Sequence, residues 1–307
     1  MDISVLIVSW NVLDLLDACI RSILANTAPG QVEILVIDSA STDRTAEHIS
    51  AAFPGVRLFA QSENIGFTKG TNLALGEARG RYLMLLNPDT VIIGDALLVM
   101  QQYLDTHPGV GMVGPHTLNP DGTTQSSRRR FPTLVTAIFE STWLQGYAPP
   151  GVLERFYVTD TPEDATIEVD WVQGSALMAR REVYEQIGGL DEGYIMYSEE
   201  MDWCRRAKDA GWRVAFLGDA RIIHHGGKST DQVVARRHIH FQESKLRYFR
   251  KYHGALAANG LRLFLLTSYA VQIGIEAAKG MLGLKRPLRR ERVRQYLEVL
   301  RSGLKVT

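Results

Sequence analysis

Cysteine is scarce in this sequence, and its scarcity argues against a disulfide framework or a cysteine-based metal site. The 307 residues include two cysteines, Cys19 and Cys204, and neither lies in the spacing of a metal or redox motif. So few cysteines suit a reducing compartment, and we expect a cytoplasmic protein. The N-terminal segment MDISVLIVSWN lacks the basic region and the long apolar core of a signal peptide, so we interpret it as a first strand.

Net charge and long apolar runs are also absent. Lys and Arg together number 34, as do Asp and Glu, so the charge balance gives no sign of a nucleic-acid partner. The most apolar stretch, residues 256–284, is interrupted by Arg262, Glu276 and Lys279. It therefore misses the roughly 18 uninterrupted apolar residues expected of a membrane-spanning helix.

Two glycine-rich signatures are missing as well. A nicotinamide dehydrogenase needs GxGxxG after its first strand, and the segment SWNVLDLL lacks it. The glycine-rich first loop of a sugar-phosphate nucleotidyltransferase is also absent. These two classes of nucleotide-binding enzyme are therefore excluded.

Strands and helices alternate regularly through the first 115 residues. Apolar runs rich in β-branched residues predict the strands, and apolar residues at helical spacing predict the helices between them. This alternation implies right-handed crossovers and an α/β fold with a mostly parallel, doubly wound sheet. The strands are predicted at residues 3–10, 33–38, 56–60, 82–86 and 110–113, and the helices at 14–26, 42–52, 68–78 and 95–106.

Polar residues follow three of these strands, at the edge where parallel sheets bind their ligands. The strands end in SWN, DSAS and NPD, at residues 9–11, 38–41 and 87–89. A single Asp at such a place is as often a turn or a helix cap as a ligand. Three polar strand ends at one edge favour a binding site.

The regular pattern loosens between residues 117 and 170, which we interpret as a loop-rich insertion. It contains Arg128, Arg129 and Arg130, which form either a solvated basic loop or a clamp for a phosphate or diphosphate. Regular structure then returns. Strands are predicted at residues 172–179 and 212–217, and helices at 181–187 and 199–210.

After Arg236 the sequence is almost wholly helical. An apolar helix precedes the strongly basic segment LKRPLRRERVRQ. This order suits a segment lying on an anionic membrane surface. It suits equally a helical pair that packs on the domain or in a dimer interface.

Carboxylates and imidazoles together could form a metal and catalytic site. One Asp, one His and a diphosphate would complete the shell of Mg²⁺ or Mn²⁺, and the cation would neutralise a departing nucleoside diphosphate. A second carboxylate could take a proton from an incoming hydroxyl. The same acids could instead only stabilise a helix N-terminus. The residues concerned are Asp89, Glu199, Glu200, Asp202, His224 and His225.

Seven segments occur in an order that carries a resemblance to a known family. They are VSWN (8–11), VIDSASTDRT (36–45), ENIGFTKGTN (63–72), LLNPDT (85–90), WVQGSALMARR (171–181), GGLDEGYIMYSEEMDWCRRAKDAGW (188–212) and HHGGKS (224–229). With these segments the sequence resembles inverting glycosyltransferases of family 2, which have the nucleotide-sugar-binding GT-A fold. Within that family it looks most like bacterial rhamnosyltransferases of cell-wall and O-antigen assembly.

The resemblance implies a donor site with a divalent metal, Mg²⁺ or Mn²⁺. LNPD looks like this subgroup's form of the DxD metal motif, with Asn87 in place of the first Asp and Asp89 as the last. His224 matches the family's metal- or diphosphate-contacting histidine, and Asp38 would contact the nucleoside. The other donor-binding residues that the resemblance implies are Ser9, Asn11, Ser41, Asn64, Gly66 and Lys69.

The resemblance also implies the catalytic residues. The family's usual base is the second acid of a Glu-Asp pair, which here is replaced by Glu199 and Glu200. We expect Glu200 to be the base, Glu199 to orient sugar hydroxyls and Asp202 to position the helix. The replacement keeps open an alternative, a non-catalytic homologue that only binds a nucleotide sugar. The acceptor-binding residues would be Trp171, Gly174, Arg128 and Arg129.

The implied reaction is a single in-line displacement that inverts the anomeric carbon. The expected donor is dTDP-L-rhamnose, with a UDP-hexose or UDP-galactofuranose as alternatives. The expected acceptor is a saccharide, either free or linked to a polyprenyl diphosphate, and we expect the protein to meet it at the inner face of the cell membrane. The C-terminal helices could instead form a homodimer interface. We divide the chain into a GT-A catalytic domain, residues 1–235, and a helical C-terminal extension, 236–307. Residues 1–115 would bind the nucleotide sugar and 116–235 the acceptor.

Overall fold

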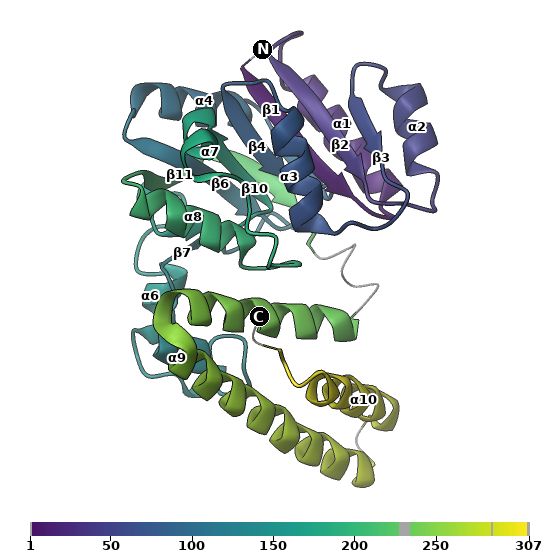
Figure 1. Cartoon of the computed structure of the whole chain (residues 1–307), viewed down its shortest axis with the longest axis vertical. Helices are drawn as coiled ribbons and strands as arrows, with labels where there is room; N and C mark the ends of the chain where they lie inside the picture. The colour runs from purple at the N-terminus through teal and green to yellow at the C-terminus, as the bar shows by residue number, and fades with distance from the viewer. Residues whose placement is uncertain (1, 227–233, 284, 306–307) are drawn as a thin grey trace. The chain divides into compact units, whose positions relative to one another are not determined.

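The computed structural model describes residues 2–226, 234–283 and 285–305. Its main sheet has nine strands, and helices pack against it (Figure 1). The strand order is β3-β2-β1-β4-β10-β6-β11-β5, with β8 beside β11. Most strands point one way, and only β10, β5 and β8 run antiparallel to their neighbours. The strands are β1 (Ile3–Ser9), β2 (Val32–Asp38), β3 (Arg57–Ala60), β4 (Tyr82–Leu86), β5 (Thr90–Ile93), β6 (Val110–Leu118), β8 (Ile167–Val169), β10 (Ala176–Arg180) and β11 (Arg213–His224).

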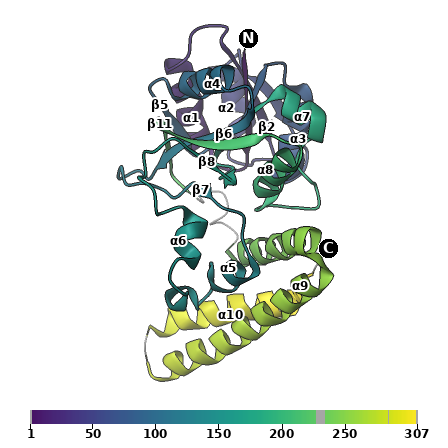
Figure 2. The ribbon, with the colours of Figure 1, turned by 90° about the vertical axis from the view of Figure 1, so that its left-hand side faces the viewer.

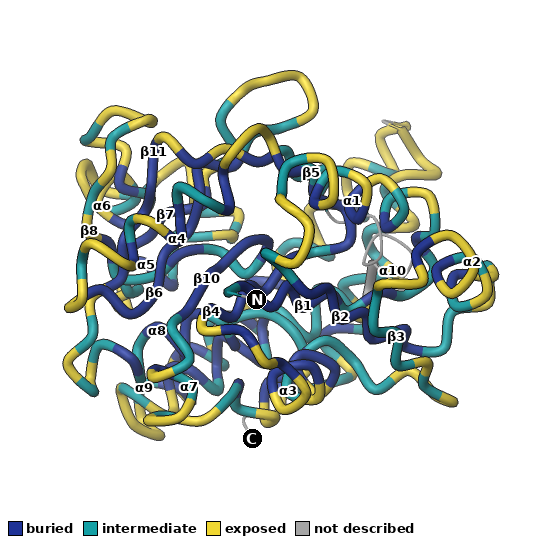
Figure 3. The backbone as a smooth tube through the Cα atoms, turned by 90° about the horizontal axis from the view of Figure 1, so that it is seen from above, coloured by how far each residue is buried: buried dark blue, intermediate teal, exposed yellow. Residues whose placement is uncertain are grey.

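Helices cover both faces of the sheet, which confirms the predicted α/β architecture. Side chains alternate along a strand, so in β1 Ile3 and Val5 join one apolar core while Leu6 joins the other. Figure 3 shows the central strands buried and the outer sides of the helices exposed. The first core is packed by α1 (Leu13–Ala25), α2 (Thr45–Ala52) and α4 (Ala96–Thr106), and the second by α3 (Phe67–Glu77), α7 (Arg181–Ile187) and α8 (Glu199–Asp209).

The structure corrects the strand predictions in three places. The sequence does not predict β5, which only residues 87–89 separate from β4. The strand predicted at 172–179 is two strands, β9 (Trp171–Val172) and the antiparallel β10, separated by residues 173–175. β6 and β11 are longer than predicted because they pair with each other as far as Leu118 and Ile223. This pairing carries the end of β11 to the start of β5.

The predicted loop-rich insertion contains short regular elements. A two-residue strand, β7 (Arg128–Arg129), pairs with β9 and makes the arginine run part of a small second sheet. The other elements are α5 (Leu134–Phe139), the 3-10 helix η1 (Gln145–Tyr147) and α6 (Val152–Tyr157).

The buried carboxylate of Glu33 stabilises the beginning of β2. Asp38 lies at the other end of the same strand. Glu33 accepts hydrogen bonds from Ser4 Oγ at 2.5 Å, from the Arg79 backbone N–H at 2.6 Å and from Arg57 Nη1 at 3.1 Å. Burial acts to raise the pKa of Glu33, but these donors outweigh burial, and the net effect lowers that pKa. The ionised form of Glu33 therefore stabilises the fold.

The chain forms two compact units. The grouping differs from the predicted division at residue 235, because residues 132–156 and 193–198 belong with the C-terminal helices. Of the described residues, unit 1 holds 2–131, 157–192 and 199–226, and unit 2 holds 132–156, 193–198, 234–283 and 285–305.

The predicted helical C-terminal extension is confirmed in unit 2. It consists of α9 (Val234–Met281), which bends at Gly254 where φ is 86°, and α10 (Arg286–Ser302). α10 packs along α9, as Figure 2 shows. Arg289 Nη1 lies 2.6 Å from Glu276 Oε2, and Arg262 Nε donates to the Gly303 carbonyl oxygen at 2.7 Å.

One helix of unit 2 has the length and composition of a membrane span. Among the described residues, only Arg236–Met281 is long and apolar enough to pass this test. The core helix of a soluble protein passes the same test.

Candidate active site

The carboxyl ends of β1 and β2 present two buried polar atoms without a partner. Ser9 and Asp38 are register partners at the ends of these strands. Asp38 is 2% exposed and Ser9 is 0% exposed, and neither Asp38 Oδ1 nor Ser9 Oγ has a hydrogen-bond partner among the described residues. A buried polar atom without a partner costs free energy, so such a pair marks a place where a ligand can supply hydrogen bonds. Both residues lie where the sequence predicts the donor nucleoside.

Asn11 and Ser41 join the loops that follow β1 and β2. The Asn11 backbone N–H donates to Ser41 Oγ at 2.9 Å, and Asn11 Oδ1 accepts from the Thr42 N–H at 2.7 Å. Asn11 has a φ of 52°, a left-handed conformation that asparagine tolerates. In the structure these two predicted donor-binding residues brace the loops around Asp38.

Asn64 and Gly66 shape the turn before α3. Asn64 Oδ1 accepts from Ser39 Oγ at 3.1 Å and from the Gly66 N–H at 2.9 Å. Gly66 has a φ of 78°, which a residue with a Cβ rarely adopts. Lys69 follows in the first turn of α3 with its side chain exposed. Because Ser39 follows Asp38 directly, this turn is tied to the same edge of the sheet.

Asn87, Asp89 and His224 form the candidate metal site. β5 and β11 pair with Thr90 opposite His224, so the residue before β5 lies beside the end of β11. His224 Nε2 lies 3.3 Å from Asp89 Oδ1 and 3.3 Å from Asn87 Nδ2. The His225 backbone N–H donates to the Asp89 carbonyl oxygen at 2.9 Å, which fixes this pairing.

This donor set fits a divalent cation that keeps open positions. Among the described residues no three His, Cys, Asp or Glu side chains form a metal-binding group. One carboxylate oxygen and one imidazole nitrogen suit Mn²⁺ or Mg²⁺ when phosphate oxygens and water complete the shell. Residues 227–229 of the HHGGKS segment lie outside the described residues.

Glu199 and Glu200 begin α8 and present a second group of acids, of which Glu199 is buried and Glu200 is half-buried. Glu199 Oε2 and Glu200 Oε2 are both buried and have no hydrogen-bond partner among the described residues. Burial raises the pKa of Glu199 well above its usual value, and the neighbouring Glu200 carboxylate raises it further. Burial also raises the pKa of Glu200, while backbone N–H groups and the Arg129 guanidinium partly oppose this rise.

Asp202 is paired with a basic side chain. Asp202 Oδ2 lies 2.9 Å from Arg206 Nε, and the same guanidinium donates to the carbonyl oxygens of Ile187 at 2.6 Å and Gly189 at 2.5 Å. Arg206 therefore ties α8 to the segment that ends α7, and Asp202, on the same helix, holds that guanidinium in place. The role of Asp202 in positioning the helix stays a prediction.

Residues 174 and 175 connect the two acidic groups. The Gly174 backbone N–H donates to Glu200 Oε1 at 3.3 Å, and the Ser175 carbonyl oxygen accepts from the Asn87 N–H at 2.9 Å. A Cβ at Gly174 would contact the Glu200 side chain at 3.4 Å. The short loop between β9 and β10 thus touches the candidate metal site on one side and the candidate base on the other.

The structure corrects both sequence interpretations of Arg128. Its side chain is not solvated, because the residue is 5% exposed. Its guanidinium donates to the carbonyl oxygens of Thr161 and Pro162, each at 2.8 Å, and lies 5.0 Å from the centre of the Phe216 ring. Arg128 therefore holds the insertion against β11, and these donors are not directed at an acceptor diphosphate.

Arg129 and Trp171 also have structural partners. Arg129 is 7% exposed, its Nη1 donates to Ser126 Oγ at 2.6 Å, and its guanidinium lies 4.6 Å from the centre of the Tyr157 ring. Trp171 Nε1 donates to the Arg130 carbonyl oxygen at 3.0 Å. The prediction of a solvated arginine loop is therefore wrong for Arg129 as well. The positive charge of Arg129 opposes the rise in the pKa of Glu200, which links Arg129 to the candidate base.

Two other expectations can be judged from burial and contacts. Trp203 is fully buried in the second core, with its Nε1 donating to the Gly188 carbonyl oxygen at 2.9 Å, which confirms the expected core role. The sequence missed Gln125, whose Oε1 lies 2.6 Å from His224 Nδ1. The only feature of the sequence that drew attention to Gln125 was its position directly before the arginine-rich SSRRR segment.

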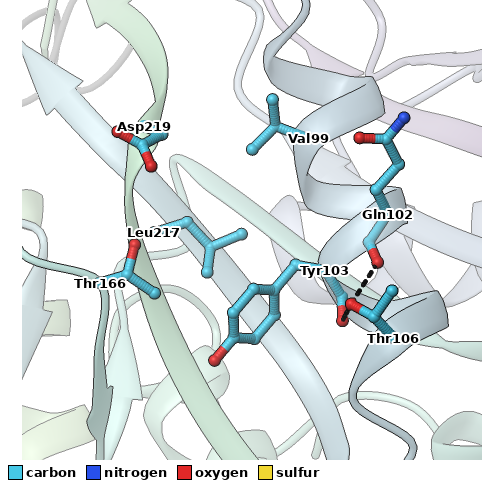
Figure 4. A pocket seen from close by; sticks show the side chains of 7 residues that line it. All are labelled: Val99, Gln102, Tyr103, Thr106, Thr166, Leu217 and Asp219. Atoms are coloured by element: carbon cyan, nitrogen blue, oxygen red, sulfur yellow. Dashed lines mark hydrogen bonds between the residues drawn. The ribbon is translucent and has the colours of Figure 1, made fainter.

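A pocket of about 290 Å³ lies elsewhere in unit 1, between α4 and β11 (Figure 4). None of the predicted site residues lines it. We therefore place the candidate active site at the polar strand ends and not in this pocket. It is lined by Val99, Gln102, Tyr103, Thr106, Thr166, Leu217 and Asp219.

Curated proteins similar to this chain include named rhamnosyltransferases. The chain is 30% identical over 210 residues to an N-acetylglucosaminyl-diphospho-decaprenol L-rhamnosyltransferase of Mycobacterium tuberculosis, which covers 65% of this chain and 68% of the relative. It is 26% identical over 209 residues to the rhamnosyltransferase WbbL of Escherichia coli, covering 61% of this chain and 70% of the relative. These names confirm the resemblance to rhamnosyltransferases.

Solved structures confirm the GT-A fold. A mannosyltransferase from Pyrobaculum calidifontis, PcManGT in complex with GDP-Man and Mn²⁺, aligns with a TM-score of 0.59 at 16% identity over 99% of this chain and 86% of that one. S. aureus TarS 1–349 aligns with a TM-score of 0.53 at 17% identity over 99% and 90%. At these identities the likeness shows the fold alone. The family model for glycosyl transferase family 2 matches residues 4–188, and the chain therefore belongs to that family.

Proposed function

We propose that this glycosyltransferase moves L-rhamnose from dTDP-L-rhamnose to a saccharide acceptor, with metal assistance and inversion of the anomeric carbon. The observation that carries the proposal is the loop at residues 174–175. It contacts the candidate base Glu200 and the Asn87 backbone of the candidate metal site. A base and a leaving-group site held by one short loop suit a displacement in which both act on the same sugar.

The nucleotide would bind along the edge formed by β1, β2 and β4. Asp38 Oδ1 and Ser9 Oγ would take up hydrogen bonds from the nucleoside, since both atoms are buried and without a partner among the described residues. Asp89 and His224 would hold Mg²⁺ or Mn²⁺ against the diphosphate. When bound, the cation supplies positive charge where the leaving diphosphate develops negative charge.

Glu200 would take the proton from the acceptor hydroxyl. Burial and Glu200 raise the pKa of Glu199 well above its usual value, whereas hydrogen bonds and Arg129 oppose the rise for Glu200. We assign Glu200 as the carboxylate that takes the proton, because the Gly174 N–H donates to its Oε1, and Glu199 as the acid that orients a sugar hydroxyl.

The choice of rhamnose rests on the names of the relatives from M. tuberculosis and E. coli. A UDP-hexose or UDP-galactofuranose donor is the alternative within the same chemistry. A non-catalytic binding protein is the alternative of a different class, favoured only by Asn87 and Glu200 in place of aspartates.

Calorimetric titration with a panel of nucleotide sugars, with and without Mn²⁺ or Mg²⁺, tests the donor proposal. We expect dTDP-L-rhamnose to bind tightly and to depend on the metal. If a UDP-sugar binds more tightly than dTDP-L-rhamnose, that UDP-sugar is the donor. If the folded protein binds no nucleotide sugar of the panel, the proposed donor site is wrong. Release of dTDP from the bound donor would then exclude the purely binding alternative, and the anomeric configuration of the product would test inversion.

For the acceptor, we propose a polyprenyl-diphosphate-linked saccharide at the inner face of the cell membrane, with unit 2 lying on the lipid surface. Lys and Arg far outnumber Asp and Glu in unit 2, and since the whole chain has 34 of each, unit 1 carries the matching acidic excess. Apolar side chains of unit 2 are exposed beside this charge, including Leu256 at 88% and Leu263 at 69%. Exposed apolar and basic side chains together suit an anionic bilayer.

Flotation with lipid vesicles tests this placement. We expect binding to vesicles that contain anionic phosphatidylglycerol, weaker binding to neutral phosphatidylcholine, and loss of binding in Leu263→Asp. Deletion of residues 236–307 that left vesicle binding unchanged would contradict the proposal. A concentration-dependent dimer that Leu263→Asp dissociates, without vesicle binding by the native protein, would favour the homodimer instead.

A further inference from the structure

Gln125 lies directly behind the imidazole of the candidate metal site. Its Oε1 is 2.6 Å from His224 Nδ1, although 99 positions separate the two residues in the sequence. Its Nε2 donates to Asn119 Oδ1 at 3.0 Å and to the His224 carbonyl oxygen at 3.4 Å. Both ends of the amide are thus used, and the side chain touches the ring and the backbone of the same histidine.

The direction of the Gln125–His224 hydrogen bond is fixed by a chain of bonds that starts at a carboxylate. Asp121 Oδ1 can only accept when ionised, and it receives the Thr123 hydroxyl proton at 2.6 Å. Thr123 Oγ1 then accepts from Asn119 Nδ2 at 3.0 Å, which leaves Asn119 Oδ1 to accept from Gln125 Nε2. Gln125 Oε1 must therefore face the histidine as an acceptor, so Nδ1 of His224 carries the proton.

This proton position decides what the other ring nitrogen can do. In a neutral imidazole with its proton on Nδ1, Nε2 presents a lone pair. That nitrogen lies 3.3 Å from Asp89 Oδ1, which is also an acceptor, and 3.3 Å from Asn87 Nδ2, a donor that suits a bare Nε2 lone pair. Two acceptors directed at the same place suit a cation, and metal-binding histidines commonly donate their other N–H to a group that fixes the ring.

We propose that Gln125 is a positioning residue for the metal site, holding His224 as the Nδ1–H tautomer with Nε2 directed at the cation. This inference rests on the proposed function, because it assumes that Asp89 and His224 bind the metal. It adds a residue from the insertion, far from both ligands in the sequence, to the parts that set metal affinity. Asp121, Thr123 and Asn119 set the direction of the bonds, and of these four residues it is Gln125 that contacts the ring.

Three variants of the full chain separate this role from a general effect on the fold. Gln125→Met keeps the length of the side chain but removes the amide acceptor. Gln125→Glu keeps an acceptor oxygen facing Nδ1 and should therefore rescue once the Asn119 amide turns its NH₂ group toward the second carboxylate oxygen. Gln102→Met makes the same chemical change on the exposed side of α4 and is the matched control.

Mn²⁺ titration in the presence of dTDP, followed by electron paramagnetic resonance, is the first measurement. We expect the Mn²⁺ dissociation constant to rise about 10- to 100-fold in Gln125→Met, and to stay within about threefold of the native value in Gln125→Glu and Gln102→Met. A native-like dissociation constant in Gln125→Met would overturn the proposal. No Mn²⁺ binding by the native protein would instead overturn the proposed metal site itself.

The tautomer can be measured without any metal or variant. ¹⁵N NMR of the histidine rings in the metal-free native protein should show His224 protonated at Nδ1, with assignment from its loss in His224→Gln. A proton on Nε2 with bare Nδ1 would overturn the proposal whatever the titrations give. If Gln125→Met does not fold, Gln125→Ala replaces it, and this ring measurement still decides the outcome.

Discussion

Replacing Glu200 with glutamine should remove most of the transfer activity while leaving the fold and donor binding intact. The amide has the same shape as the carboxylate, and its oxygen can still accept from the Gly174 N–H at 3.3 Å. It cannot take a proton from the acceptor hydroxyl. A positioned general base contributes about 10²- to 10⁴-fold to rate, so kcat should fall by about that factor, or about 3–5 kcal/mol in the barrier.

The same variant should change stability in a direction set by the pKa of Glu200. Burial raises this pKa in the folded protein above its unfolded value. Below the unfolded pKa, the carboxyl is protonated in both states and the substitution should have little effect. As pH rises above that value, the unfolded state gains from ionisation and the native protein loses stability, so Glu200→Gln should melt at a higher temperature than the native protein at pH 7 but not at pH 4.

The assays are nucleoside diphosphate release with and without acceptor, donor titration by calorimetry, and thermal unfolding at the two pH values. Glu185→Gln, on the exposed side of α7, is the matched control and should behave as the native protein. The reasoning is refuted if Glu200→Gln keeps more than a tenth of the native kcat. A larger loss in Glu199→Gln than in Glu200→Gln would exchange the roles of the two acids.

Three further predictions concern the metal site and the fold. Asp89→Asn should abolish the effect of Mn²⁺ on donor affinity, as measured by calorimetry, and an unchanged metal dependence would contradict its assignment as a ligand. Glu33→Gln should lower the free energy of unfolding in urea by about 1.5–3 kcal/mol at pH 7, because hydrogen bonds to a charged group are lost. Since the pKa of Glu33 is lowered in the folded protein, this difference should vanish as pH falls through that pKa. A difference that stays constant with pH would argue against this link between ionisation and stability. Gly114→Ala should destabilise by about 1–3 kcal/mol, because its Cβ would lie 2.6 Å from Val172 Cβ, and unchanged thermal unfolding would show that the strands can move apart.

The sequence predicted the parts of the fold that depend on local patterns. Apolar runs and helical spacing placed the strands and helices of the first half within a few residues of their observed bounds, because periodicity is a property of neighbouring residues. The failures lie where pairing between distant segments decides the structure. The insertion of antiparallel β10 beside β4 and the extension of β11 to His224 both depend on partners far along the chain.

The candidate site shows the same division. By itself the sequence determined the family resemblance, the polar strand ends, and the acids and histidine proposed for catalysis, since these are identities at fixed positions. Only the tertiary structure decided that Arg128 is buried within the insertion, that one carboxylate oxygen of Glu199 and one of Glu200 are shielded from water, and that Gln125 orients His224. Burial, pKa shifts and hydrogen-bond direction arise from atoms brought together across the fold, and no local pattern of residues encodes them.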